Sequence, residues 1–234
     1  MMDCSYTYHD IAKMIDHALL SPQLTISELE AGIQLARRYD VASVCIQPYY
    51  LARCTELLAG STVLPSTTIG FPHGGHTTAI KEAESVRAIA DGCQELDMVV
   101  NLGWVCSGRW DAVRSDIQAV IDVAHADQRK VKVIFETYYL HADQKIRLCE
   151  LCAELGADWV KTSTGFAAGG ATHEDVTLMR KHSPPEVQVK ASGGIRSFDQ
   201  LLAFRKLGAS RVGASGTVVI LDECRLCLGL PPLP

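Results

Sequence analysis

Short runs rich in β-branched residues alternate along the 234-residue chain with longer stretches whose apolar residues recur at helical spacing. This alternation is typical of repeated βα units built around a parallel sheet. Runs such as 131–135 are apolar at nearly every position, as expected when helices cover one face of a strand and packed side chains cover the other. The predicted strands are Lys13–His17, Ala42–Ile46, Thr62–Ile69, Leu96–Asn101, Lys130–Glu136, Asp158–Thr162, Val187–Ala191 and Arg211–Ala214.

A helical pattern follows each predicted strand. Ser27 and Glu30 have the spacing of a capping box and predict where the first of these helices begins. Gly92, Gly156 and Gly208 stand where helices are expected to end, because glycine accepts left-handed backbone angles. The predicted helices are Ser27–Asp40, Tyr49–Ala59, Thr77–Asp91, Arg109–Ala126, Ala142–Leu155, His173–His182, Phe198–Leu207 and Ser215–Cys227.

Eight βα units in one chain favour a closed (β/α)8 TIM barrel over an open doubly wound sheet. We expect a single α/β domain over residues 1–234 with a short N-terminal extension. The chain is 47% hydrophobic and 21% charged, which is enough apolar material for a sizeable core. Its net charge of -5 argues against a general nucleic-acid binder, although backbone amides can still bind a phosphate locally.

Neither a membrane-spanning run nor the basic and apolar regions of a signal peptide is found in the sequence. We therefore expect a cytoplasmic protein without a membrane partner. The nine cysteines are odd in number and lie within apolar segments. Reduced and mostly buried thiols are the expected state in a reducing compartment.

Polar residues at the carboxyl ends of the strands are the candidates for chemistry, because active sites of such barrels form there. Lys161 and Lys190 lie on adjacent interior strands. Burial and the repulsion between two ammonium groups both lower the pKa of a lysine, and a neutral amine can attack a carbonyl to form an imine. Asp97 on the fourth strand is the candidate for proton transfer.

A structural role for these lysines stays open from the residues alone, because a lysine near a strand end usually pairs with a carboxylate. The presence of two neighbouring lysines together with Asp97 and Asp16 favours chemistry more than a single lysine would. Lys132 on the fifth strand is either a third lysine of the site or the ion-pair partner of Glu136 or Asp97.

Glycine-rich segments follow the last three strands, at 164–170, 191–195 and 212–216. Barrels commonly bind phosphate after the seventh and eighth strands, through backbone amides and a helix N-terminus. Together with the strand ends, these segments supply the expected substrate-binding residues Asp16, Cys45, Lys132, Thr164, Gly165, Gly193, Gly194, Gly213, Ala214 and Ser215.

Two segments resemble those of a known family. The segment 158–166, Asp-Trp-Val-Lys-Thr-Ser-Thr-Gly-Phe, resembles the lysine signature of deoxyribose-phosphate aldolases, and 189–196, Val-Lys-Ala-Ser-Gly-Gly-Ile-Arg, resembles their second-lysine segment. Weaker matches extend the resemblance in order from about Asp10 to Gly216.

The resemblance implies reversible cleavage of 2-deoxy-D-ribose 5-phosphate to acetaldehyde and D-glyceraldehyde 3-phosphate, without a metal or other cofactor. It implies that Lys161 forms the imine, that Lys190 lowers its pKa, and that Asp97 moves protons through a water. A homodimer acting in deoxyribonucleotide catabolism is the state that the resemblance suggests.

Three positions depart from the family pattern. Ala18 stands where a threonine is usual, the last loop has the single serine Ser215 where two are common, and no tyrosine follows Tyr139. The resemblance therefore implies differences in substrate placement, phosphate binding and assistance to proton transfer.

Two motifs suggest metal binding. Cys149 and Cys152, like Cys224 and Cys227, have the spacing of zinc ligands. Both pairs fall on predicted helices that are not neighbours in a barrel, so packing is the favoured interpretation. The motif His73-x-x-His76 lacks a third histidine at a fitting distance for a metal-dependent aldolase.

Two other functions remain as alternatives. One is another Schiff-base sugar-phosphate aldolase or a transaldolase, which would share the imine but differ in its donor and acceptor pockets. The other is a catalytically silent barrel that binds a sugar phosphate, for which loss of one of Asp97, Lys161 and Lys190 would be expected.

Overall fold

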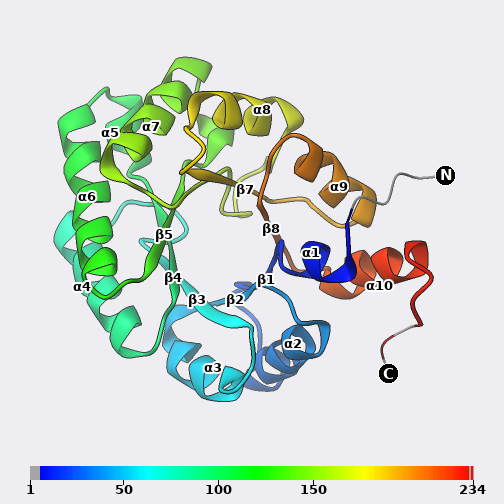
Figure 1. Cartoon of the computed structure of the whole chain (residues 1–234). Helices are drawn as coiled ribbons and strands as arrows, with labels where there is room; N and C mark the ends of the chain where they lie inside the picture. The colour runs from blue at the N-terminus through cyan, green and yellow to red at the C-terminus, as the bar shows by residue number, and fades with distance from the viewer. Residues whose placement is uncertain (1–5, 232, 234) are drawn as a thin grey trace.

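The computed structural model of the chain describes residues 6–231 and residue 233 (Figure 1). Eight parallel strands pair in chain order, and the last pairs with the first to close a barrel. This confirms the predicted (β/α)8 barrel. The strands are β1 (Ile15–Leu19), β2 (Ser43–Ile46), β3 (Leu64–Ile69), β4 (Glu95–Val99), β5 (Lys130–Ile134), β6 (Trp159–Lys161), β7 (Gln188–Ser192) and β8 (Arg211–Ala214).

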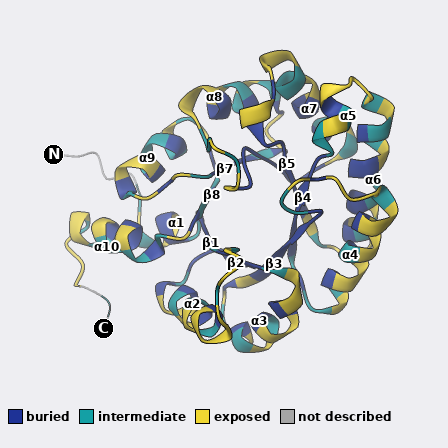
Figure 2. Ribbon diagram, turned by 180° about the vertical axis from the view of Figure 1, so that it is seen from behind, coloured by how far each residue is buried: buried dark blue, intermediate teal, exposed yellow. Residues whose placement is uncertain are grey.

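A ring of helices surrounds the strands, with buried faces toward the barrel and exposed faces outward (Figure 2). All eight predicted helices are present, with ends shifted by a few residues. None of the helices in the described part of the chain is long and apolar enough to cross a membrane. The ring consists of α2 (Ile26–Tyr39), α3 (Leu51–Leu58), α4 (Thr78–Ala90), α6 (Trp110–Ala126), α7 (Ala142–Leu155), α8 (His173–His182), α9 (Phe198–Lys206) and α10 (Thr217–Cys227).

Three short helical elements were not predicted: α1 (Tyr8–Ala12), α5 (Leu102–Cys106) and the 3-10 turn η2 (Thr137–Tyr139). A further 3-10 turn, η1 (Pro48–Tyr50), forms the start of the predicted helix Tyr49–Ala59. Each is shorter than a periodic pattern needs in order to be visible in sequence. The predicted N-terminal extension is described only from residue 6 onward, where α1 lies beside α10 (Figure 1).

The first predicted strand begins two residues too early. Lys13 is the C-cap residue of α1, and its amine bonds the Asp40 carboxylate at 2.7 Å. β1 therefore begins at Ile15 and extends to Leu19. The apolar residues Ile11 and Met14, which belong to the core around α1, obscure this boundary in the sequence.

The predicted capping box at Ser27 is also wrong by two residues. Thr25 is the N-cap of α2: its hydroxyl accepts from the Glu28 amide at 3.3 Å, and its own amide donates to Glu28 Oε2 at 2.8 Å. Ser27 lies inside the first turn. Glu30 reaches away from the helix start and accepts from Arg53 Nε at 3.1 Å.

The glycines and cysteines of the helices follow the prediction. Gly156 is the left-handed C-cap of α7 with φ 77°, and Gly92 and Gly208 likewise have positive φ after α4 and α9. No disulfide joins the described cysteines, and most of them are buried. Cys149 and Cys152 lie buried on α7; on α10, Cys224 is buried and Cys227 exposed.

His17 gives the fold a dependence on pH that can be measured. The ring is buried on β1, and its Nδ1 lies 2.8 Å from the Thr217 hydroxyl at the start of α10. Burial lowers the pKa of His17 from 6.5 to about 4. Since the folded pKa is the lower one, this contribution to stability is complete above pH 6.5 and is lost as the pH falls through 4. Its upper bound is about 3 kcal/mol.

We expect the unfolding free energy, measured by urea denaturation, to fall between pH 7 and pH 4 in the parent protein. In His17→Asn this fall should be smaller, because the buried imidazole is absent. The exposed His9, replaced in the same way, serves as the matched control and should keep the parent slope. Equal slopes for the His17 variant and the parent would contradict this account.

Candidate active site

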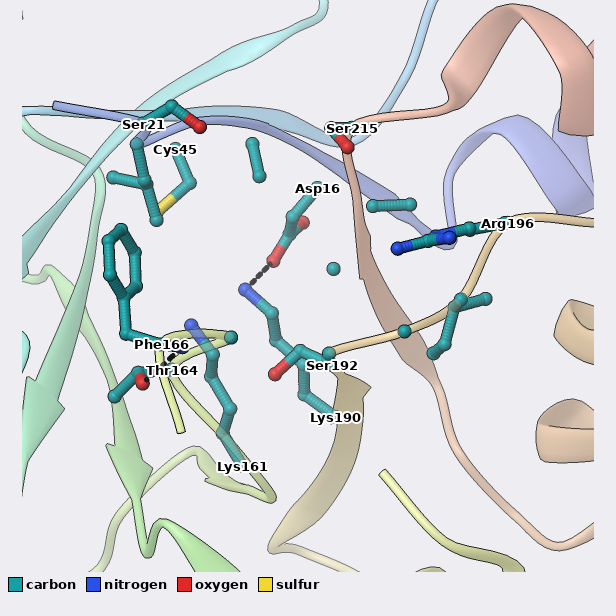
Figure 3. Close-up of a pocket in the computed structure, with 18 residues that line it drawn as sticks. Asp16, Ser21, Cys45, Lys161, Thr164, Phe166, Lys190, Ser192, Arg196 and Ser215 are labelled. Carbon is teal, nitrogen blue, oxygen red and sulfur yellow. Dashed lines mark hydrogen bonds and ion pairs between the residues drawn. The ribbon is translucent and has the colours of Figure 1, made fainter. Parts of the chain in front are cut away.

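A polar cavity of about 390 Å³ opens at the carboxyl ends of the barrel strands (Figure 3). Its lining comes from β1, β2, β6, β7 and β8 and from the loops that follow them. All predicted site residues except Asp97 and Lys132 line it. They are Asp16, Cys45, Lys161, Thr164, Gly165, Lys190, Gly193, Gly194, Gly213, Ala214 and Ser215.

Asp97 lies below this cavity, completely buried on β4. Its Oδ2 accepts from Lys161 Nζ at 2.6 Å and from Lys190 Nζ at 2.8 Å, and its Oδ1 accepts from Lys132 Nζ at 2.9 Å. Strand register produces this arrangement, because Asp97 pairs with Lys132 across β4 and β5, and Lys161 pairs with Lys190 across β6 and β7. One carboxylate therefore holds three amines.

Further ion pairs complete a buried layer across the barrel. Lys190 lies 2.5 Å from Asp16, and Lys132 donates to Glu95 at 2.6 Å. Arg211 at the start of β8 bonds both Asp16 and Glu95. The cations of the layer are Lys132, Lys161, Lys190 and Arg211, and its carboxylates are Asp16, Glu95 and Asp97.

With every group charged, these four cations and three carboxylates would leave one net positive charge in the barrel interior. A buried charge without compensation is costly, and an ionisable group commonly avoids this cost by losing its proton. The layer therefore favours a lowered pKa for one of its lysines.

The surroundings of each amine indicate which lysine it is. Burial and the nearby Lys190 ammonium lower the pKa of Lys161, and although Asp97 opposes them the pKa stays below 10.5. Burial also lowers the pKa of Lys190, but Asp16 and Asp97 outweigh it, so that the pKa of Lys190 is raised. Asp16 thus separates the two lysines, since the pKa of Lys161 is lowered and that of Lys190 is raised.

Lys132, the third lysine that contacts Asp97, stays charged. Burial opposes its charge, but the carboxylates of Asp97, Glu95 and Asp16 raise its pKa well above 10.5. It is fully buried and lies outside the lining of the cavity, although we expected it among the substrate-binding residues. Asp97 and Glu136 were the two expected ion-pair partners of Lys132, and Lys132 pairs with Asp97 and not with Glu136.

Glycines form one end of the cavity, where phosphate is expected. Gly193 and Gly194 have φ of 90° and 82°, a conformation that other residues rarely adopt. A Cβ at Gly213 would lie 2.8 Å from the Ser192 Cβ and 3.4 Å from the Lys190 Cε, so its absence keeps room for the lysine. α10 begins two residues after Ser215, and helix N-termini favour anions.

The lining also contains Ser21, Phe166, Ser192 and Arg196, which were not among the predicted site residues. The Arg196 guanidinium points into the cavity from the side where Ser215 lies (Figure 3). A cation placed two residues after a glycine pair beyond a strand end is a signal that the sequence carries, since phosphate sites often combine both. Phe166 had no such signal, because aromatic residues in loops serve many purposes.

Glu95 and Arg211 were not predicted, because they lie at the starts of their strands and not at the carboxyl ends. Both belong to the ion layer, where they bind Asp16 and Lys132 from below. Glu136 at the end of β5 takes a left-handed conformation with φ 53° and is buried. Its carboxylate accepts from the Thr164 amide at 3.2 Å and from the Thr164 hydroxyl, which fixes the start of the loop after β6.

The histidine motif after β3 has no metal-like arrangement. His76 pairs with Glu84 at 3.4 Å, and His73 is exposed. No group of three or more His, Cys, Asp or Glu side chains among the described residues is arranged to hold a metal ion.

Fold and site together define a (β/α)8-barrel enzyme that carries a buried amine at the ends of its strands. The family model of the DeoC/LacD family aldolases matches residues 11–225. A deoxyribose-phosphate aldolase of Rhodopirellula baltica is 60% identical over 97% of this chain and 95% of its own length, and one of Thermococcus gammatolerans is 47% identical over 92% and 97%.

The solved structure of the deoxyribose phosphate aldolase from Aeropyrum pernix, described as a tetramer, agrees with a TM-score of 0.86 at 29% identity. The comparison covers 94% of this chain and 92% of that one. The chain belongs to the DeoC/LacD aldolase family, and the family resemblance seen in the sequence is confirmed.

We expect Lys190→Met to raise the pKa of Lys161, because it removes the neighbouring ammonium and leaves Asp97 with fewer partners. The rate at which a small acylating reagent modifies Lys161, followed by mass spectrometry, should reach half its maximum at a higher pH than in the parent. Lys130→Met is the matched control, since Lys130 is exposed at the other end of β5. An unshifted curve for the Lys190 variant would refute the proposed coupling.

A second expectation concerns the contact between two loops of the site. A Cβ at Gly170 would lie 2.5 Å from the carbonyl carbon of Gly193, whereas one at Gly75 would meet nothing within 4 Å. Gly170→Ala should therefore lower the unfolding free energy by about 1–3 kcal/mol. Gly75→Ala should stay near the parent value in the same urea denaturation; equal losses in both variants would show that the contact does not matter.

Proposed function

We propose that the chain is a class I aldolase that reversibly cleaves 2-deoxy-D-ribose 5-phosphate to acetaldehyde and D-glyceraldehyde 3-phosphate through an imine on Lys161. The observation that carries the proposal is the position of Lys161. Its amine lines the cavity, has a lowered pKa and rests on the Asp97 carboxylate at 2.6 Å. The names of the relatives, deoxyribose-phosphate aldolases of high coverage, support the choice of substrate.

In the cleavage direction, the neutral Lys161 amine adds to the C1 carbonyl and loses water, giving a protonated imine. A base removes the proton of the C3 hydroxyl, the C2–C3 bond breaks, and its electron pair moves into the imine. D-glyceraldehyde 3-phosphate leaves, and the remaining enamine takes a proton at C2. Addition of water then releases acetaldehyde and restores the amine.

Asp97 is the proposed source and acceptor of protons, acting through a water because its carboxylate lies below the cavity lining. The three lysines around it outweigh burial and hold its pKa well below 3.8, so it is a carboxylate at neutral pH. Lys190 stays charged, and its ammonium group helps to lower the pKa of the Lys161 amine. These two residues thus prepare the nucleophile.

The other end of the substrate is proposed to bind at the glycine loops after β7 and β8. Arg196 supplies a full positive charge there, while Gly193, Gly194 and Ser215 supply backbone amides and a hydroxyl. In Figure 3, Lys161 and Lys190 lie between this end and the opposite wall formed by Phe166 and Cys45. The cavity therefore has a charged end and an apolar end.

Borohydride trapping tests the proposal directly. With 2-deoxy-D-ribose 5-phosphate or acetaldehyde present, reduction should inactivate the protein irreversibly and leave an ethyl group on Lys161, found by peptide mass spectrometry. A chelator should not change the result. Lys161→Met should lose activity by roughly 10³-fold or more, whereas Lys130→Met retains it.

Trapping on another residue, or no trapping together with loss of activity in EDTA, would overturn the imine mechanism. A panel of donors separates this function from the related Schiff-base aldolases. Acetaldehyde should be accepted and dihydroxyacetone phosphate rejected; the reverse would assign the chain to a different substrate class.

We also propose that copies of the chain associate as a homodimer and that the protein acts in the cytoplasm in deoxyribonucleotide catabolism. The tetrameric relative from Aeropyrum pernix supports self-association. Exposed apolar side chains on α4, Ile80 and Val86, supply a surface that such contacts could bury. Light scattering at micromolar concentration measures the number of subunits.

A further inference from the structure

A second, smaller cavity lies directly beside the proposed active site. It measures about 180 Å³ and lies among the loops after β1, β2, β3 and β6. Most of its lining is apolar, while Gln47, Thr68 and Glu84 contribute polar groups; the apolar residues are Leu20, Pro22, Pro48, Phe71, Pro72 and Phe166. We call this cavity the side pocket. Leu20 and Phe166 line the side pocket and the main cavity alike, so these two residues form the partition between them.

Leu20 and Phe166, the two residues of the partition, are positioned by different contacts. The Gln47 amide donates to the Ser21 carbonyl at 2.9 Å, which fixes the backbone beside Leu20. The Phe166 backbone amide donates to the Thr164 hydroxyl at 3.0 Å. Phe166 as a whole is 45% exposed, and its ring meets that of Phe71 edge-on with 5.3 Å between centroids. Exposed side chains change rotamer within nanoseconds. Phe166 can therefore move without disturbing the loop backbone.

The charges of the main cavity orient any sugar phosphate within it. The phosphate is drawn toward Arg196 and the glycine loops, and the carbonyl carbon must reach Lys161. Phe166 lies on the other side of Lys161 from Arg196 (Figure 3). The part of a substrate that faces the partition is therefore the carbonyl end, which carries no charge and becomes the donor component of the aldol reaction.

We propose that the side pocket is a subsite for an alkyl substituent on the donor aldehyde and that Phe166 determines how large this substituent can be. The inference rests on the proposed aldolase function and extends it to donors longer than acetaldehyde. The volume of 180 Å³ corresponds to several waters of about 30 Å³ each, which is room for a short alkyl chain.

The chemistry with a longer donor is unchanged. The donor forms an imine on Lys161 with loss of water and then gives up a proton from its α-carbon to become an enamine. That carbon forms the new C–C bond to the acceptor aldehyde, whose oxygen takes a proton. Hydrolysis of the resulting imine then consumes one water, equal to the one lost before, and releases the product and the Lys161 amine. The alkyl group takes no part in bond making and needs only an apolar place to lie.

The test measures addition of acetaldehyde, propanal and butanal to D-glyceraldehyde 3-phosphate by the complete chain. Phe166→Ala opens the partition, and kcat/KM for butanal relative to acetaldehyde should rise roughly tenfold, the scale of one or two methylenes entering an apolar pocket. Phe71→Trp adds volume inside the side pocket, next to Phe166, at a residue that does not line the main cavity, so the same ratio should fall.

Tyr138→Ala is the matched control, because Tyr138 is an exposed aromatic residue that lines neither cavity. It should keep the parent ratio. An unchanged ratio in both the Phe166 and the Phe71 variants, with acetaldehyde addition intact, would overturn the subsite alone. Failure of the parent protein to add acetaldehyde at all would overturn the proposed function, and the subsite with it.

Discussion

The Asp97 carboxylate, buried in the barrel and shared by Lys132, Lys161 and Lys190, is the contact on which the site depends. Closure of the barrel makes it possible, because it brings β4, β5, β6 and β7 around one interior where each can contribute a side chain. Three amines on one carboxylate would be too much positive charge to bury, so Asp16 and Glu95 balance part of it. Counted together with Arg211, the cations of the layer outnumber its carboxylates by one, and the surroundings lower the pKa of Lys161.

Lys161 and Lys190, which pair across β6 and β7, thus have pKa values that are shifted in opposite directions. Lys190 faces two carboxylates and has a raised pKa, whereas Lys161 has Asp97 alone and the Lys190 charge beside it. Arg211 supports the difference indirectly, since it binds Asp16 and Glu95 from the start of β8 and keeps both oriented toward the lysines. The layer below the cavity prepares an amine, and the loops above it supply the charged and apolar ends that would orient a substrate.

The order of elements and most of the cavity lining could be predicted from sequence because they follow from local pattern. Period and β-branching identified the strands, and the rule that barrel sites lie at strand ends identified Lys161, Lys190 and Asp16. Glu95 and Arg211 could not be found in that way, because they contribute from the starts of their strands. The raised pKa of Lys190 depends on its distance to Asp16, which only the closed barrel sets. The start of α2 was misplaced because two Ser/Thr-x-x-Glu patterns overlap there and only the backbone at Thr25 decides between them.

The central claim is that the pKa of Lys161 is lowered while those of its neighbours Lys190 and Lys132 are raised. Its most direct test is an NMR titration of the protein with 13C-labelled lysine side chains, the signals being assigned through single lysine variants. The account predicts that Lys161 loses its proton at a lower pH than the exposed lysines, while Lys190 and Lys132 remain protonated beyond them. Deprotonation of Lys190 before Lys161, or an ordinary lysine titration for all three, would contradict it.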